Sequence, residues 1–110
     1  MSGAVRAGGV SKAALDLVAS SALLADAYDL DSLVATVATS DSSGAALTGT
    51  VRWPRDGAAG AFEITRDAGS AVTSYIVTHV LSGVTKTYTQ PALTRDASGA
   101  VTNRPAITVV

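Results

Sequence analysis

The chain has 110 residues, a formal net charge of −1 and no cysteine. This length suits a single domain, and the near-neutral charge argues against a nucleic-acid-binding or polybasic membrane surface. The lack of cysteine excludes disulfides, thiolate metal sites and cysteine nucleophiles. Hydrophobic residues make up 47% of the chain but aromatic residues only 5%, so small aliphatic side chains must form the core. Such a core buries little area per residue. Charged residues make up only 15%, and this low charge indicates that part of the surface faces another protein.

The first ten residues, MSGAVRAGGV, are small and, apart from Arg6, uncharged. Because these residues have few large apolar side chains that a core could bury, residues 1–10 are predicted to be a flexible N-terminal arm. The N-terminal region also resembles a signal peptide faintly, but Asp16 interrupts its apolar stretch, so we do not expect one. No run of about 18 apolar residues exists that would predict a membrane span.

Residues 11–28 predict a helix. Ser11 is a suitable N-cap, and the following stretch is rich in Ala and Leu and free of Gly and Pro. Apolar side chains recur at helical spacing over about residues 12–27. An extended pair is the alternative, because Leu15 and Leu17 also alternate with a polar residue.

Residues 29–110 are typical of β-structure. Short segments rich in β-branched residues alternate in polarity, and Gly, Pro or Asp bounds each of them. The segments are SLVATVATS, AALTGTVRW, GAFEITR, AVTSYIVTHVL, VTKTYTQ, GAVTNR and AITVV. Short strands at this spacing, with no helices between them, predict an antiparallel β-sandwich or barrel.

One phrase occurs three times, as TSDSSGAALT at 39–48, TRDAGSAVT at 65–73 and TRDASGAVT at 94–102. An Asp followed by small residues and a Gly is typical of a hairpin turn, because Asp accepts backbone hydrogen bonds and Gly adopts the left-handed conformation. The predicted hairpin-tip residues are Asp41, Gly44, Asp67, Gly69, Asp96 and Gly99. Because Gly69 stands one place earlier than its counterparts, we expect that loop to be shorter or of another type. If the tips gather at one end of the domain, that end is a candidate contact surface.

Few residues are candidates for chemistry. His79 is the only histidine, and no carboxylate lies near it in the sequence, so a structural or partner-facing role is favoured over a ligand or general base. Asp26, Asp29 and Asp31 form the densest acidic group, but the glycine and distal glutamate of a calcium-binding loop are missing. We expect these three to be solvated carboxylates after the helix. The sequence predicts no catalytic residue, metal or cofactor.

Trp53 is the one residue expected to anchor the core, because it ends an alternating strand where a large side chain can fill the interior. The alternative is an exposed contact residue, since a lone Trp beside a proline also occurs in binding surfaces. Trp53 is therefore kept as a candidate interface residue together with Val5, Arg6 and Val10 of the arm.

Residues 48–110 include VRWPRDGAAGAFEI, VTSYIVTHV and KTYTQPALTRDASGAVTNRPAITVV. These stretches resemble small β-domains of tailed-bacteriophage virion proteins, in which a Trp-Pro strand end and a Q-P-x-x-T-R-D-x-S-G-x-V-T closing hairpin recur. The resemblance implies an immunoglobulin-like sandwich and a structural, non-enzymatic role in a virion assembled in the host cytoplasm. A capsid decoration (cement) protein, a head fibre and a tail component are the candidates.

The favoured function is therefore a capsid decoration protein that binds the particle through its N-terminal segment and a lattice-facing β surface. Expected partners are major capsid or tail subunits and further copies of the chain, with no nucleic acid and no membrane. The alternatives are a phage tail or fibre component and a bacterial surface or adhesion module of immunoglobulin-like fold. An adhesion module predicts export and a longer parent chain, whereas the initial Met and final AITVV strand suit a complete small protein.

Overall fold

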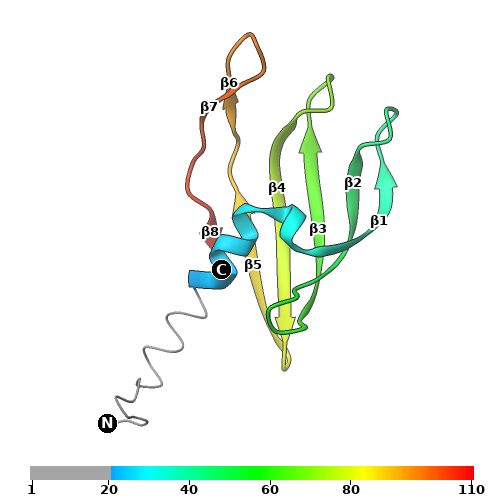
Figure 1. Ribbon diagram of the computed structural model, residues 1–110, viewed down its shortest axis with the longest axis vertical. Coiled ribbons are helices and arrows are strands. Elements are labelled where there is room, and N and C mark those ends of the chain that lie inside the picture. The colour runs from blue at the N-terminus through cyan, green and yellow to red at the C-terminus, as the bar shows by residue number, and fades with distance from the viewer. Residues whose placement is uncertain (1–20) are drawn as a thin grey trace.

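The computed structural model describes residues 21–110 (Figure 1). The arm predicted over residues 1–10 and the first part of the predicted helix lie outside the described residues. Residues 21–28 are helical, which confirms the end of the helix predicted over 11–28. Leu23 and Ala27 are both buried, as expected for side chains four positions apart on one helical face. Within residues 21–110, no helix has the length and apolar character needed to cross a membrane.

Six strands form one antiparallel sheet in the order β1-β2-β3-β4-β5-β8 (Figure 1). The strands are β1 (Val34–Ser40), β2 (Ala46–Arg52), β3 (Ala59–Arg66), β4 (Val72–Leu81), β5 (Val84–Gln90) and β8 (Thr108–Val109). A separate two-stranded sheet pairs β6 (Thr94–Arg95) with β7 (Val101–Asn103). The first five strands are neighbours both in sequence and in space, so most of the sheet is a simple meander.

The chain is mainly β, as predicted, and each segment expected to be extended contains a strand. The immunoglobulin-like sandwich is not confirmed, because residues 21–110 place six of the eight strands in one sheet and only the β6–β7 hairpin in another. A short 3-10 helix, η1 (Leu30–Ser32), which the sequence did not predict, connects the helix to β1. Asp29 caps this turn, since its carboxylate accepts the amide of Asp31 at 3.2 Å.

One face of the sheet carries the core. Phe62, Val77 and Tyr88 are buried and stand opposite one another on β3, β4 and β5. Leu23 and Ala27 of the helix belong to the same buried cluster, so the helix covers this face of the sheet. Burial of these side chains between the helix and the sheet provides the hydrophobic stabilisation of the fold, in a chain with few aromatic residues.

Hydrogen bonds from tyrosine hydroxyls fix the helix on the sheet. The Tyr75 hydroxyl donates to the carbonyl oxygen of Ala27 at 2.6 Å. The Tyr28 hydroxyl accepts the amide of Ile107 at 2.8 Å, just before β8. The end of the helix is therefore tied both to the middle of the sheet and to its last strand.

The opposite face of the sheet is largely exposed. Thr36, Thr50 and Ala61 stand side by side on β1, β2 and β3, and all three are exposed. On β4 the same face includes Ile76 and Val80, which are 37% and 38% exposed. We name this surface, which is formed by the outward side chains of β1 to β5, the open face.

Candidate functional site

The three predicted hairpin tips lie at the same end of the molecule. The β1–β2, β3–β4 and β6–β7 loops all point upward in Figure 1. Asp41, Asp67 and Asp96 begin these loops, which confirms that the repeated phrase forms hairpin tips.

The three loops have one geometry. In each, the Asp amide donates to the carbonyl oxygen of the fourth following residue, at 2.8 Å for Asp41, 2.9 Å for Asp67 and 3.0 Å for Asp96. One carboxylate oxygen accepts the amides of the second and fourth following residues, at 2.9 to 3.1 Å. The three loops thus satisfy their backbone donors in the same way, by the turn chemistry that the Asp residues predicted.

The prediction that the Asp67 loop is shorter or of another type is wrong. The third residue after each Asp adopts a positive φ, which is 91° at Gly44, 68° at Ser70 and 90° at Gly99. Ser70 therefore occupies the left-handed position that glycine takes in the other two loops, and Gly69 precedes it. Hydrogen bonds hold the serine there, because its amide donates to the Asp67 carbonyl oxygen at 3.0 Å and its hydroxyl to Asp41 at 2.7 Å.

Two of the tips are joined directly. The Ser70 and Ser43 hydroxyls each donate to a different carboxylate oxygen of Asp41, both at 2.7 Å. The same two hydroxyl oxygens are 2.7 Å apart. Bonds from Ser70 and Ser43 and from the amide of Ala45 hold the pKa of Asp41 far below its usual range. This carboxylate is therefore an ionised link between the β1–β2 and β3–β4 loops.

Two arginines connect successive hairpins, a role that the sequence analysis missed. Arg66 donates to the carbonyl oxygen of Ser70 in its own loop at 2.9 Å and to that of Ala46 in the preceding hairpin at 2.8 Å. Arg95 repeats this pattern, with bonds to the carbonyl oxygens of Gly99 at 2.9 Å and Val72 at 2.8 Å.

The sequence contains a signal for this connection. Arg precedes Asp in the second and third copies of the phrase, whereas Ser40 takes that place in the first copy. Within residues 21–110, no hairpin precedes the first one, and β1 is the outermost strand of the sheet. The Thr-Arg-Asp form of the phrase therefore both makes a turn and attaches that turn to its neighbour.

Trp53 is fully buried, which confirms its expected place in the core. Its indole N–H donates to the Thr78 carbonyl oxygen at 2.9 Å. Its ring meets His79 edge-on, with the ring centroids 5.1 Å apart, and lies 5.4 Å from Tyr88. Because the side chain has no exposed surface, it does not serve as a contact residue in this fold.

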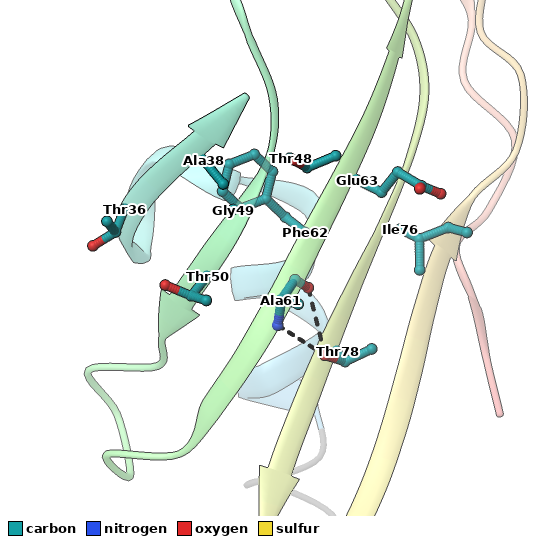
Figure 2. A pocket seen from close by; sticks show the side chains of 10 residues that line it. All are labelled: Thr36, Ala38, Thr48, Gly49, Thr50, Ala61, Phe62, Glu63, Ile76 and Thr78. Carbon is teal, nitrogen blue, oxygen red and sulfur yellow. Dashed lines mark hydrogen bonds between the residues drawn. The ribbon is translucent and has the colours of Figure 1, made fainter. Parts of the chain in front are cut away.

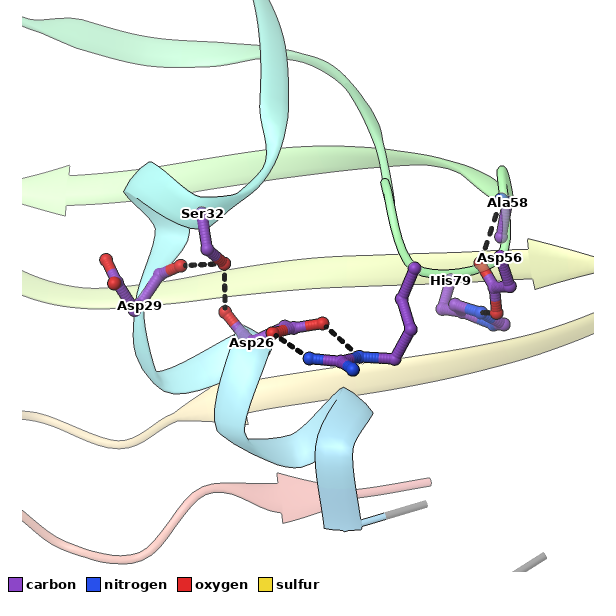
Figure 3. A network of polar contacts seen from close by, with 7 residues as sticks. Asp26, Asp29, Ser32, Asp56, Ala58 and His79 are labelled. Carbon is purple, nitrogen blue, oxygen red and sulfur yellow. Dashed lines mark hydrogen bonds and ion pairs between the residues drawn. The ribbon is translucent and has the colours of Figure 1, made fainter. Parts of the chain in front are cut away.

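His79 is 4% exposed and has a carboxylate partner that the sequence did not reveal. Its Nε2 lies 2.7 Å from a carboxylate oxygen of Asp56 (Figure 3), 23 positions earlier in the chain. Burial by itself raises the pKa of Asp56, but the bonds from His79 and the Ala58 amide and the nearby charge of His79 outweigh burial and lower it. The pair links the turn after β2 to β4 and supports the structural role expected for the histidine.

The prediction of solvated carboxylates is wrong for Asp26. Its side chain is 15% exposed and forms an ion pair at 2.9 Å with Arg55 of the loop after β2. Figure 3 labels Asp26 on the helix. The loop folds back beside the helix, which brings together two residues 29 positions apart. The acidic group is thus divided, since Asp26 attaches the helix to the loop and Asp29 caps η1.

No group of three or more His, Asp or Glu side chains in residues 21–110 is arranged to hold a metal ion. Each hairpin Asp directs one carboxylate oxygen into its own loop. The other candidate interface residues, Val5, Arg6 and Val10, lie outside the described residues.

The open face contains a hollow of about 500 Å³ (Figure 2). Gly49 lies beside it and leaves no room for a side chain, because a Cβ atom there would lie 2.1 Å from the Thr36 carbonyl oxygen and 2.6 Å from the Phe62 ring. Threonines surround the hollow, and Glu63 is its only charged lining residue. The lining residues are Thr36, Ala38, Thr48, Gly49, Thr50, Ala61, Phe62, Glu63, Ile76 and Thr78. The lining of this hollow therefore offers methyl groups and hydroxyls together.

Comparison of the chain with protein-family models, with curated proteins and with solved structures found no match.

Proposed function

We propose that the protein is a non-enzymatic structural component of a phage virion, in which it acts as a capsid decoration protein. The observation that carries the proposal is the open face, which leaves one side of a six-stranded sheet available for contact. Ile76 and Val80 are partly exposed on it, and exposed apolar side chains gathered on one face of a protein are typical of binding surfaces.

The charges of the open face fit a neutral protein partner. Among the described strands, its charged side chains are Arg52 on β2 and Glu63 on β3, and both are exposed. Threonine and small apolar residues make up most of the remainder. A lattice protein needs only weak contacts of this kind, because symmetry repeats each of them many times.

The sequence likeness of residues 48–110 to tailed-phage β-domains supports the virion part of the proposal. In this arrangement the N-terminal segment binds the particle and the sheet contacts neighbouring subunits. The immunoglobulin-like sandwich belongs to the same proposal, and its second layer would come from a neighbouring subunit that covers the open face.

The test is binding of the purified full-length protein to particles of the phage whose genome carries the gene, measured by co-sedimentation. We expect saturable binding, and at least a tenfold loss of affinity for Thr50→Glu and Ile76→Glu, which place charge on the open face. Ser98→Glu places the same charge on the gathered hairpin tips, the other candidate contact surface, and should bind like the wild type. Circular-dichroism melts would show that each variant is folded.

Failure of the wild-type protein to bind particles at any concentration would overturn the virion proposal. Detection of the native protein on the surface of bacterial cells would favour the adhesion-module alternative. Equal losses for Ser98→Glu and Thr50→Glu would show that the open face is not the specific contact.

A further inference from the structure

The two edges of the large sheet differ in how they are protected. β1 forms one edge, and all seven of its residues are exposed (Figure 1). Its sequence, VATVATS, contains no charged residue and no proline, two of the features that usually protect a free edge. Its register shifts against β2, a third such feature, begin only after Val37. The other edge ends in β8, which has only two residues. Among the strands that the structure describes, β1 therefore offers the longer unpaired backbone.

An uncovered part of the core face lies beside this edge. Val37 pairs with Gly49, which in turn pairs with the buried Phe62, so Val37 is on the core side of the sheet. It is nevertheless 50% exposed. A groove of about 260 Å³ runs past it, with Ala35, Phe62 and Ile64 in its lining. The free backbone and the uncovered apolar side chains thus occur at the same strand.

We propose that a second copy of this chain pairs with β1 in antiparallel orientation across a two-fold axis at Val37. Val37 is the middle residue of Val34–Ser40 and precedes the register shifts of β1 against β2, so this register centres the pairing on the strand. It places Val34 opposite Ser40, Ala35 opposite Thr39 and Thr36 opposite Ala38 of the second copy. The two Val37 side chains then lie together on the core side, and the two grooves form one continuous surface.

The charges around β1 favour its own copy as the occupant. The strand is uncharged, and in this register the flanking Asp31 faces Ser43 while Asp41 faces Leu33 of the second copy. No like charges stand opposite each other, which is the arrangement that would oppose antiparallel pairing. Pairing of β1 with the β8 edge would instead be head-to-tail and would generate open fibres rather than a closed dimer.

The interface is small. Stable protein–protein interfaces bury roughly 1,600 Å² in total, and a single pair of seven-residue strands lies at the low end of that scale. The dimer should therefore dissociate on dilution in the micromolar range, on the order of 10 to 100 µM. In an assembled particle, repetition of the contact would raise its effective strength.

This inference rests on the homo-oligomeric part of the proposed function and does not require the virion part. Dimerisation without particle binding would overturn the virion proposal alone. Particle binding by a protein that stays monomeric would overturn the β1 pairing alone.

Single cysteines test the pairing directly, because the chain has no cysteine of its own. Val37→Cys in the full-length protein should form a disulfide-linked dimer under mild oxidation, since opposite Cβ atoms in antiparallel strands lie about 4.5 to 5.5 Å apart. Val84→Cys is the control, because Val84 is 60% exposed on β5, which lies on the opposite side of the sheet from β1. Cross-linking of Val37→Cys that does not exceed that of Val84→Cys would overturn the proposal.

Charge exchange gives a second test that does not depend on oxidation. Val37→Lys and Val37→Glu should each raise the dimer dissociation constant at least tenfold in analytical ultracentrifugation, because like charges then face each other. An equimolar mixture of the two variants should restore dimers through opposite charges. A wild-type protein that is monomeric up to about 1 mM, or a mixture that remains monomeric, would overturn the proposal.

Discussion

Replacement of Ser70 tests the shared geometry of the three hairpin loops. Ser70 has a φ of 68°, in the left-handed region where Gly44 and Gly99 stand in the other loops. A residue with a Cβ atom is disfavoured there by roughly 1–2 kcal/mol. Ser70→Gly removes this cost but also removes the hydroxyl that donates to Asp41. This single variant therefore combines a gain in stability from the relieved backbone with a loss of stability from the missing hydrogen bond.

Comparison of Ser70→Gly with Ser70→Ala separates the two effects, because both variants lose the hydroxyl. The Ala variant keeps the energetic cost of a Cβ atom in the left-handed conformation. The Gly variant avoids this cost but loses roughly 0.5–1 kcal/mol of stability, because its unfolded chain has greater entropy. We expect the free energy of unfolding to be about 1 kcal/mol higher for Gly than for Ala. For a domain of this size that corresponds to a melting temperature roughly 4–8 °C higher.

Urea unfolding followed by the fluorescence of Trp53, the only tryptophan, measures this difference. Ser98, one position before the left-handed residue of the third loop, is the matched control. Its Gly variant should be no more stable than its Ala variant, because Ser98 has no positive φ. Equal stability of Ser70→Gly and Ser70→Ala would refute the conclusion that the second loop shares the geometry of the others.

Three further predictions concern the buried polar groups. Trp53→Phe removes the buried indole N–H bond and should lower the free energy of unfolding by about 1–3 kcal/mol; urea unfolding followed by circular dichroism that shows no loss would contradict it. Gln90 is fully buried and accepts a bond from Arg104 at 2.9 Å, so Gln90→Leu should lower the free energy of unfolding by about 1–3 kcal/mol; an unchanged midpoint of urea unfolding would contradict it. The bond from His79 helps to lower the pKa of folded Asp56 below its ordinary value of 3.8, so this carboxylate adds stability above pH 3.8 that is lost as the pH falls through the folded pKa. Asp56→Asn should therefore flatten the acid branch of the plot of melting temperature against pH, and an unchanged slope would refute the importance of this pair.

Local features of the sequence were sufficient for the strands and turns. Alternation of β-branched and polar residues predicted the strand segments, because side chains on a strand alternate between its two faces. Asp and Gly predicted the tips at Asp41 and Asp96. Asp accepts hydrogen bonds from backbone amides of the turn, Gly adopts its left-handed conformation, and both act within a few positions. The same local reasoning failed at Ser70, where the bond that its hydroxyl donates to Asp41 of a neighbouring hairpin supports a conformation that its own sequence disfavours.

The arrangement of the strands could not be predicted in the same way. Alternation shows that one face of a strand is buried, but it does not show whether a second sheet or a helix covers that face. In this protein the helix of residues 21–28 and η1 cover one side, and the described strands form one large sheet where a sandwich was expected.

The sequence alone therefore determined which segments are extended, where the chain turns and that Trp53 is a core residue. Only the tertiary structure brought His79 to Asp56, Arg55 to Asp26 and the Ser70 hydroxyl to Asp41. The physical reason is range: turn and strand preferences arise between residues a few positions apart, whereas these bonds join groups more than 20 positions apart. The free edge at β1 and the open face are likewise properties of the assembled sheet, because a strand becomes an edge only when no other strand lies beside it.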